Sequence, residues 1–520
     1  MVTRRFFIGG AGAFGAFGAF AGNRALVTNL FHPDAKPNLT FGVLSDLHVR
    51  AFTSPGKSDT GYGGTETLHH ALEWFRDKGA DAVVIAGDMA DLGMVEQLEA
   101  VAKTWQVVFP DNRAPDGRTV EKVFVLGNHD YHGYLYADSA ARMYPDRVER
   151  TKHVIRADIK GHWERLFKEE YRRFYCKSVN GYRFLGANWD DGTGMETGYG
   201  KNTFGIELKA YLDGHGRSLN PRRPFFYVQH QHPKDTCYGK WAWVDDGKTT
   251  AALDQYANAV VFSGHSHFSL TDERSVWQGA FTSIGAGSLR YTGTPYNSHP
   301  AGYENTLAEG PEAWRFDARK LMRNFVAGDC RQGMLWRVYD DCMVGERHEF
   351  VADVSLGPDW VIPLAAAEDR PFSYAVRMQK FSAPQFASDA KLSVRPVTLK
   401  NRGGRSPDGK TLVPVTEQES LIVTIPPPLL QPNARVFEYE VSAESKDGVV
   451  QVKNVMAEGF NHALIHEKAR SVTSCPFARE ELGRVPVRFV VTPVNSFGQR
   501  GNPLVSDYCT SFAAKESGLR

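Results

Sequence analysis

Short apolar runs alternate with amphipathic stretches along the first half of the chain. The runs that predict buried strands lie at 39–44, 81–86, 122–126, 181–186, 225–229 and 259–263. Between the first three runs, residues 65–78 and 95–108 carry apolar side chains at helical spacing. Strands that alternate with helices predict an α/β core whose strands are joined by crossover connections.

The second half of the chain has a different pattern, in which strand follows strand with turn residues between. Runs at 333–339 and 347–351 predict an antiparallel pair that closes the α/β half, and a connector containing Pro363 and Pro371 follows. Beyond it, the apolar runs lie at 391–394, 420–425, 435–442, 449–455 and 485–491. Because no helical period separates them, we expect an all-β sandwich of about 140 residues.

A chain of 520 residues is too long for one ordinary hydrophobic core, so two domains are expected. The predicted division is an export signal and spacer at 1–30, an α/β domain at 38–355, a linker at 356–371 and the β-sandwich at 372–515. The composition, with 42% hydrophobic and 23% charged residues, is that of a folded protein.

The N-terminus resembles a twin-arginine export signal. Arg4 and Arg5 precede a Gly/Ala/Phe-rich stretch, and Ala19-Phe20-Ala21 offers a cleavage site for a signal peptidase. The alternative is a retained membrane anchor, but the glycine-interrupted stretch is shorter than the roughly 20 apolar residues that a span needs. We therefore expect an exported protein, periplasmic or extracellular, with no stable membrane span after processing.

Charge and cysteine content exclude some classes of function. A formal net charge of +1 gives no signature of nucleic-acid binding. The six cysteines show no CxxC spacing, which argues against a thiolate zinc site. If an exported chain forms a disulfide, Cys475 with Cys509 is the first pair to test.

The candidate chemistry lies where predicted strands end. Five segments place Asp, Asn or His at these points: Asp46-Leu47-His48, Gly87-Asp88, Gly127-Asn128-His129-Asp130, His230-Gln231-His232 and Gly264-His265-Ser266-His267. Ligands gather beyond the carboxyl ends of strands in α/β sheets, so we expect these side chains to converge. His69 and His70 lie on a predicted helix, and we expect them to be structural or solvated.

The first two segments suit a metal site. Asp46 and His48 lie two residues apart on a segment expected to be extended, so both side chains can share one side and chelate a single cation. Asp88, beyond the neighbouring strand, is placed to bridge that cation to a second.

The remaining segments supply further ligands for the two cations. Asn128 offers a neutral amide oxygen, and His265 and His267 repeat the two-apart spacing and can serve one metal each. Two cations about 3.5–4 Å apart would clamp a phosphoryl group. The absence of cysteine among these positions favours Mn, Fe or Zn.

The ordered series of segments resembles the calcineurin-like metallophosphoesterases. The resemblance implies a four-layer α/β/β/α sandwich with a dinuclear centre, and a metal-bound hydroxide as the nucleophile. It implies that the first metal is held by Asp46, His48, Asp88 and His267, and the second by Asp88, Asn128, His230 and His265. It also implies that His129 stabilises transition-state charge or protonates the leaving group, with Asp130 orienting its imidazole.

The fourth segment leaves two histidines open. We prefer His230 as the ligand because it directly follows the apolar strand, with His232 as a hydrogen-bond donor near the site or a substrate contact. Purple acid phosphatases typically carry a glycine and a tyrosine where this chain has His48 and Asp91. An iron-tyrosinate site is therefore not expected.

The substrate is not fixed by the sequence. The long loops at 189–205 and 287–310 contain the candidate substrate contacts Trp189 and Tyr291. Asn188, just before the first loop, is a third candidate. The pattern does not distinguish a small-molecule from a macromolecular phosphoester, or a monoester from a diester, and it gives no oligomeric state. The alternative is a non-catalytic protein that binds a glycan or a protein through its C-terminal β-sandwich.

Overall fold

The computed structural model divides the chain into two compact units, Met1–Lys36 and Pro37–Arg520. It describes residues 35–50, 64–135, 146–189, 204–238, 244–296, 303–305, 314–316, 323–327, 330–364, 370–401, 404–405, 412–413, 416–483 and 485–512. The predicted export signal at 1–30 lies outside the described residues. Within the described ranges, no helix combines the length and apolarity that crossing a bilayer would need.

The first sheet contains the three parallel strands predicted at the start of the chain. β1 (Leu39–Leu44), β2 (Ala82–Ala86) and β3 (Glu121–Val125) lie side by side in that order. β14 (Gln332–Val338) runs antiparallel to β1 and pairs with β15 (Cys342–Glu349), as the predicted antiparallel pair requires. β16 (Val354–Ser355) and β17 (Trp360–Pro363) both pair with β15.

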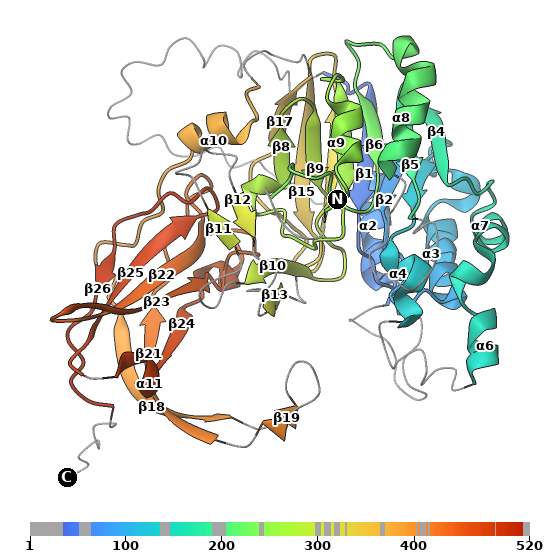
Figure 1. Cartoon of the computed structure of the whole chain (residues 1–520). Coiled ribbons are helices and arrows are strands. Elements are labelled where there is room, and N and C mark those ends of the chain that lie inside the picture. Colours follow the sequence, from blue (N-terminus) through green and yellow to red (C-terminus); the bar gives the residue numbers. More distant parts are fainter. Residues whose placement is uncertain are drawn as a thin grey trace, which may run out of the picture. The chain divides into compact units, whose positions relative to one another are not determined.

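The second sheet, like the first, combines parallel and antiparallel strands (Figure 1). Its parallel strands are β5 (Tyr182–Ala187), β6 (Phe225–Val228), β7 (Ala259–Ser263) and β9 (Thr282–Gly285). β4 (Phe174–Val179) and β8 (Val276–Gln278) flank them as antiparallel edge strands. Shorter strands of this half are β10 (Thr292–Tyr296), β11 (Tyr303–Asn305), β12 (Trp314–Phe316) and β13 (Arg323–Ala327).

The two sheets face each other across one hydrophobic core. The Phe41 ring of β1 lies 4.9 Å from that of Phe226 and 5.6 Å from that of Phe262, both in the second sheet. Successive side chains of a strand point to opposite faces, so Val84 packs into this inter-sheet core while Val83 joins the core beneath the helices. The predicted layering of sheet on sheet with helices outside is therefore present.

The outer layers contain the two predicted helices, α2 (Glu66–Asp77) and α3 (Val95–Val108), together with helices that the sequence pattern did not predict. α2 and α3 contact each other, as do α8 (Phe204–His215) and α9 (Lys248–Leu253). Leu68, Leu72 and Phe75 of α2 are buried, as the helical spacing predicts, although the Thr65 side chain forms no cap hydrogen bond. The shorter helices are α4 (Asn128–His132), α6 (Arg147–Lys152) and α7 (Ile159–Phe167).

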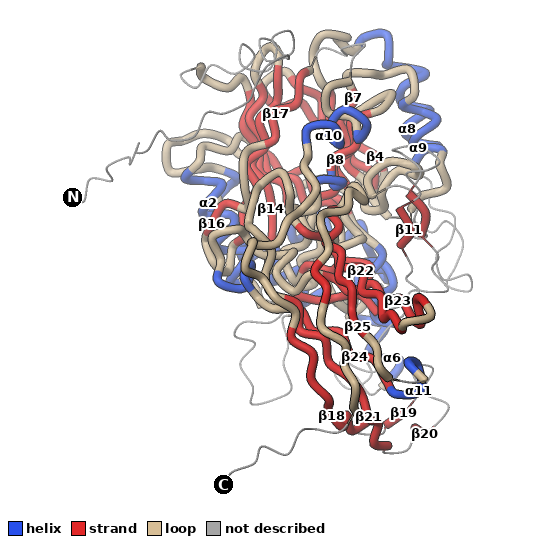
Figure 2. Tube along the Cα trace, turned by 90° about the vertical axis from the view of Figure 1, so that its left-hand side faces the viewer, coloured by secondary structure: helices blue, strands red, loops and turns tan. Residues whose placement is uncertain are grey.

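The C-terminal part folds into further β-sheets (Figure 2). One contains β18 (Ser393–Asn401), β21 (Thr416–Ile425) and β24 (Thr473–Ala478). The other contains β22 (Val436–Ser445), β23 (Gly448–Met456), β25 (Arg488–Asn495) and β26 (Leu504–Val505). Buried residues of both sheets, such as Val423 and Val441, form one hydrophobic cluster. The remaining elements of this part are β19 (Gly404–Arg405), β20 (Leu412–Val413), α10 (Tyr374–Lys380) and α11 (Arg479–Leu482).

One expectation differs from the structure, and the cysteine pair named for a disulfide test is unpaired. Residues 356–371 are not only a linker, because β17 within them extends the first sheet through β15. Its residues Trp360 and Ile362 are buried in the inter-sheet core, which explains why the chain continues as a strand there. Cys475 and Cys509 form no disulfide with each other.

Candidate metal centre

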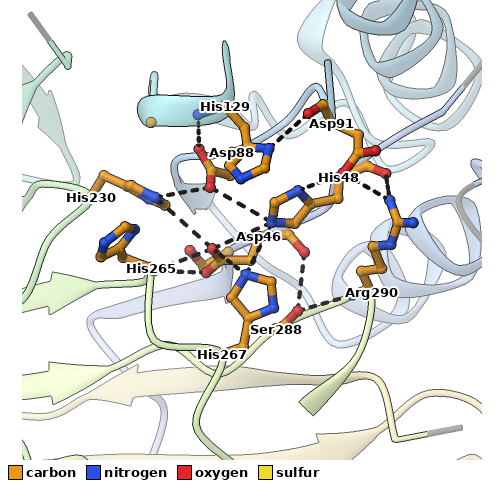
Figure 3. Close-up of polar contacts among 12 residues, drawn as sticks. Asp46, His48, Asp88, Asp91, His129, His230, His265, His267, Ser288 and Arg290 are labelled. Carbon is orange, nitrogen blue, oxygen red and sulfur yellow. Dashed lines mark hydrogen bonds and ion pairs between the residues drawn. The ribbon is translucent and has the colours of Figure 1, made fainter. Parts of the chain in front are cut away.

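All five segments meet at one edge of the two facing sheets, just beyond the ends of β1, β2, β3, β6 and β7 (Figure 3). Parallel strands end at a common edge, and two such sheets packed face to face place both sets of ends together. The convergence expected from the sequence is therefore present in the structure.

The first cluster consists of Asp46, His48 and His267, all buried. The Nε2 atom of His267 lies 3.1 Å from Oδ1 of Asp46 and 3.0 Å from Nε2 of His48. Burial opposes ionisation of Asp46, but His267, His48 and His230 hold its pKa well below the ordinary value. A buried carboxylate facing two imidazole nitrogens is a donor set for a cation.

The second cluster consists of Asp88, His230 and His265. The Nε2 atom of His230 lies 3.1 Å from Oδ2 of Asp88, and its Nδ1–H donates to the Ala86 carbonyl at 2.7 Å. The same Asp88 oxygen lies 3.6 Å from Nε2 of His48 in the first cluster. Asp88 therefore stands between the two clusters, where a bridging ligand belongs.

The donor chemistry fits two borderline divalent cations. Both clusters contain only imidazole nitrogens and carboxylate oxygens, which suit Mn, Fe or Zn. The Oδ1 atom of Asn128 is buried and has no hydrogen-bond partner. A buried amide oxygen without a hydrogen-bond partner is costly, and coordination of a metal ion would satisfy it.

The choice between the two histidines of the fourth segment follows from their surroundings. His232 is fully buried, with Nδ1 2.6 Å from the Ser263 hydroxyl and Nε2 2.8 Å from the Ser266 hydroxyl. Burial lowers its pKa to about 3. Since both ring nitrogens are engaged by serine, the predicted role of His232 as a substrate contact does not fit, and it is His230 that faces Asp88.

Several candidate ligands adopt a left-handed backbone conformation. Non-glycine residues with positive φ cost about 1–3 kcal/mol each and gather at functional sites. The candidate ligands in this conformation are Asp46 (φ 51°), His48 (43°), Asp88 (52°), His265 (70°) and His267 (56°). The expectation of an extended segment at Asp46 and His48 is therefore wrong, because left-handed turns rather than strand alternation bring these side chains together.

Two glycines are required by close approach of the segments. A Cβ at Gly127 would lie 2.2 Å from Oδ1 of Asp88, and one at Gly264 would lie 1.8 Å from Oγ of Ser45 and 2.5 Å from Oδ2 of Asp46. Gly127 precedes Asn128 and Gly264 precedes His265. Each glycine thus allows the chain to pass directly against a carboxylate of another segment.

The expected pairing of Asp130 with His129 differs from the structure. The Asp130 carboxylate accepts backbone N–H groups of Met89, Ala90 and Gly127 at 3.2, 2.6 and 2.8 Å. The Nδ1–H of His129 instead donates to the carbonyl of Asp91 at 2.7 Å. Asp130 therefore fixes the two loops, and the Asp91 carbonyl orients the His129 imidazole.

The residues that hold the first cluster in place were not predicted from the sequence. Asp91 accepts Nδ1–H of His48 at 3.0 Å and pairs with Arg50 and with Arg290, the latter at 3.2 Å. Arg290 is 5% exposed and also donates to the His48 carbonyl at 2.6 Å. The Ser288 hydroxyl donates to the Asp46 carbonyl at 3.1 Å. These groups hold the backbone and ring of the first cluster, and no motif marks them.

The predicted substrate contacts have different surroundings. Asn188 is buried and bonds the Leu126 N–H and the Arg172 carbonyl, so it holds backbone rather than facing a ligand. Trp189 is also buried, with its ring 6.1 Å from His230 and 6.3 Å from His265. Tyr291 is half-buried, with its ring 4.4 Å from that of His267. Only Tyr291 keeps a position suited to substrate contact.

Residues 39–269 of the chain match the family model described as calcineurin-like phosphoesterase. That match supports metal-dependent phosphoester hydrolysis as its chemistry. No curated protein matches the chain.

Solved structures that resemble the chain do so at low identity. A dimetal phosphatase from Danio rerio is 13% identical with a TM-score of 0.36, covering 64% of this chain and 100% of that one. GAP50 of Plasmodium, described as the anchor in the inner membrane complex, is 12% identical with a TM-score of 0.34, covering 62% and 88%. The purple acid phosphatase PPD1 from yellow lupin is 11% identical with a TM-score of 0.34, covering 63% and 55%. We draw no conclusion on substrate or reaction from these likenesses.

Proposed function

We propose that the calcineurin-like phosphoesterase domain of this chain hydrolyses a phosphate ester with two metal ions. The observation that carries the proposal is the pair of largely buried clusters, Asp46/His48/His267 and Asp88/His230/His265, with Asp88 between them. The unpartnered buried oxygen of Asn128 adds the neutral donor that such a site needs.

The chain's own ligands in this proposal are Asp46, His48, Asp88, Asn128, His230, His265 and His267. Two bound cations, of Mn, Fe or Zn, supply a Lewis acid for the phosphoryl oxygens and lower the pKa of water. The protein orients the ligands through hydrogen bonds that fix each ring. The Ala86 carbonyl holds Nδ1–H of His230, and the Asp91 carboxylate holds Nδ1–H of His48. Each of these imidazoles therefore turns Nε2 toward the centre.

His129 is the candidate for proton transfer or charge stabilisation. A carbonyl oxygen can only accept, so the Asp91 carbonyl fixes the tautomer with a proton on Nδ1 of His129. The His129 ring packs edge-on against His48 with 4.5 Å between centroids. In this tautomer Nε2 accepts a proton in the neutral ring and donates one only as imidazolium. This tautomer supports a role for His129 in proton exchange with the leaving group through Nε2.

The test is hydrolysis of p-nitrophenyl phosphate and bis-p-nitrophenyl phosphate by the full chain, with Mn²⁺, Fe²⁺ or Zn²⁺ and with chelator. We expect hydrolysis of at least one ester that chelator abolishes and metal restores. Asp88→Asn removes the shared carboxylate charge and should lower kcat/KM at least about 10²-fold. The partly exposed His69, which pairs with Glu73, provides the matched control His69→Gln. Absence of hydrolysis with every metal would favour the alternative, a non-catalytic glycan- or protein-binding chain.

Three finer points complete the proposal. The N-terminal twin-arginine-like stretch supports export to the periplasm or the extracellular space. The C-terminal sheets share one core, which supports a fibronectin- or immunoglobulin-like β-sandwich at 372–515. The preference for a monoester or a diester is left to the two test substrates.

A further inference from the structure

A further His/Asp cluster lies outside the candidate metal centre. It joins His70 of α2, His348 near the end of β15 and Asp353 in the turn that follows β15. Oδ1 of Asp353 lies 3.0 Å from Nε2 of His348 and 3.3 Å from Nε2 of His70. All three potential ligand atoms lie within 4.8 Å of one another. Two segments distant in sequence, α2 and the end of β15 with the turn after it, therefore direct two imidazole nitrogens at one carboxylate oxygen.

Aromatic packing fixes both imidazole rings. His348 stacks on Trp74 with 4.6 Å between centroids and a 26° interplanar angle. Phe350 contacts His348 from 4.9 Å and meets the edge of His70 at 5.9 Å. Rings held in this way do not need to be ordered when a ligand binds, which lowers the entropic cost of binding.

The turn that carries Asp353 is also held in place. The Glu349 carboxylate accepts the N–H of Val351 at 3.0 Å and of Ala352 at 2.6 Å. Asp353 itself has φ of 53°, a left-handed conformation that Asp and Asn tolerate better than most residues. Its carboxylate is therefore presented to the two imidazoles by a defined turn.

The donor set and its spacing match a tetrahedral transition-metal site. Metal–ligand distances near 2.0–2.1 Å place two ligands of a tetrahedron about 3.3 Å apart. The measured spacings of 3.0 and 3.3 Å agree with that edge. Burial lowers the pKa of His348, and His348 lowers the pKa of Asp353. A neutral imidazole and an ionised carboxylate are the forms that bind metals.

We propose that His70, His348 and Asp353 bind a further divalent cation of the zinc class, separate from the two of the candidate centre. The Asp353 and His70 side chains are 64% and 44% exposed, so the cation enters from solvent and water completes its coordination. The cation links α2 to the turn after β15. It stabilises the folded chain through binding rather than taking part in hydrolysis.

The test is metal analysis of the full chain after loading with Zn²⁺ and dialysis, comparing Asp353→Asn with His69→Gln. Asparagine keeps the left-handed turn but removes the charge, and His69 neighbours the site on the same helix without belonging to the cluster. We expect Asp353→Asn to lose one zinc equivalent and His69→Gln to lose none. His70→Gln provides a second variant if Asp353→Asn does not fold.

Two further readouts separate this site from the candidate centre. Zn²⁺ should raise the Tm of Asp88→Asn, whose shared ligand is altered, more than that of Asp88→Asn combined with Asp353→Asn. Hydrolysis by Asp353→Asn should equal that of His69→Gln. Equal zinc content in Asp353→Asn, His70→Gln and the unchanged chain would overturn the proposal and leave a hydrogen-bonded cluster without metal.

Discussion

Replacing Gly264 with alanine tests whether the spacing of the segments sets the site. The added Cβ would lie 1.8 Å from Oγ of Ser45, 2.5 Å from Oδ2 of Asp46 and 2.9 Å from Cβ of Ser45. Non-bonded contacts to carbon are normally about 3.5 Å, so the Asp46 carboxylate must move by about 1 Å. A misplacement of this size costs about 10²-fold in rate, or about 2.7 kcal/mol in transition-state stabilisation.

The assay is kcat/KM for the better of the two nitrophenyl esters at saturating metal, with circular dichroism to confirm folding. Gly214 in α8 provides the matched control, because a Cβ there meets no atom within 4 Å. Gly214→Ala should keep full activity. Adding Ser45→Ala to Gly264→Ala removes the nearest clash and should recover part of the loss. A folded Gly264→Ala chain with unchanged kcat/KM would refute the reasoning.

Three other changes probe groups around the site and in the C-terminal part. Asp91→Asn weakens the hydrogen bond and charge that orient His48, so the metal concentration for half-maximal activity should rise about 10–100-fold; an unchanged titration would contradict this. Gln332→Leu leaves the Leu270 N–H and the Asn461 carbonyl without their partner, and the free energy of unfolding should fall by about 1–3 kcal/mol in urea titrations; no change in midpoint would count against it. Burial raises the pKa of Glu438 to about 7 from 4.5, so its contribution to stability is full below pH 4.5 and is lost as pH rises through about 7. Between about pH 5 and about pH 8, the Tm of Glu438→Gln should therefore fall by less than the Tm of the unchanged chain. Equal falls in Tm would exclude this contribution of Glu438.

The α/β fold was predictable because its strands carry a strong local signal. β1 and α3 begin and end where their apolar patterns predict, since both faces of the strand and one face of the helix are buried. The linker was harder to predict. Its strand β17 is short, and pairing with β15 rather than its own pattern makes it a strand.

The candidate ligands were predictable because each follows a strand. The residues that hold these ligands in place were not predictable. Asp91 and Arg290 meet at 3.2 Å although about 200 residues separate them, and no spacing rule connects such positions. Asn188 looked like a substrate contact because it begins a long loop, but its amide bonds backbone groups on both sides. A loop residue near a site can therefore serve the scaffold, which only the fold reveals.

The most direct test of two metals in this centre is anomalous diffraction from crystals of the full chain loaded with Mn²⁺ or Zn²⁺. The account predicts two peaks about 3.5–4 Å apart, with Asp88 bonded to both. One peak should lie among Asp46, His48 and His267, and the other among Asn128, His230 and His265. A single peak, or none among these side chains in a folded and metal-saturated crystal, would contradict it.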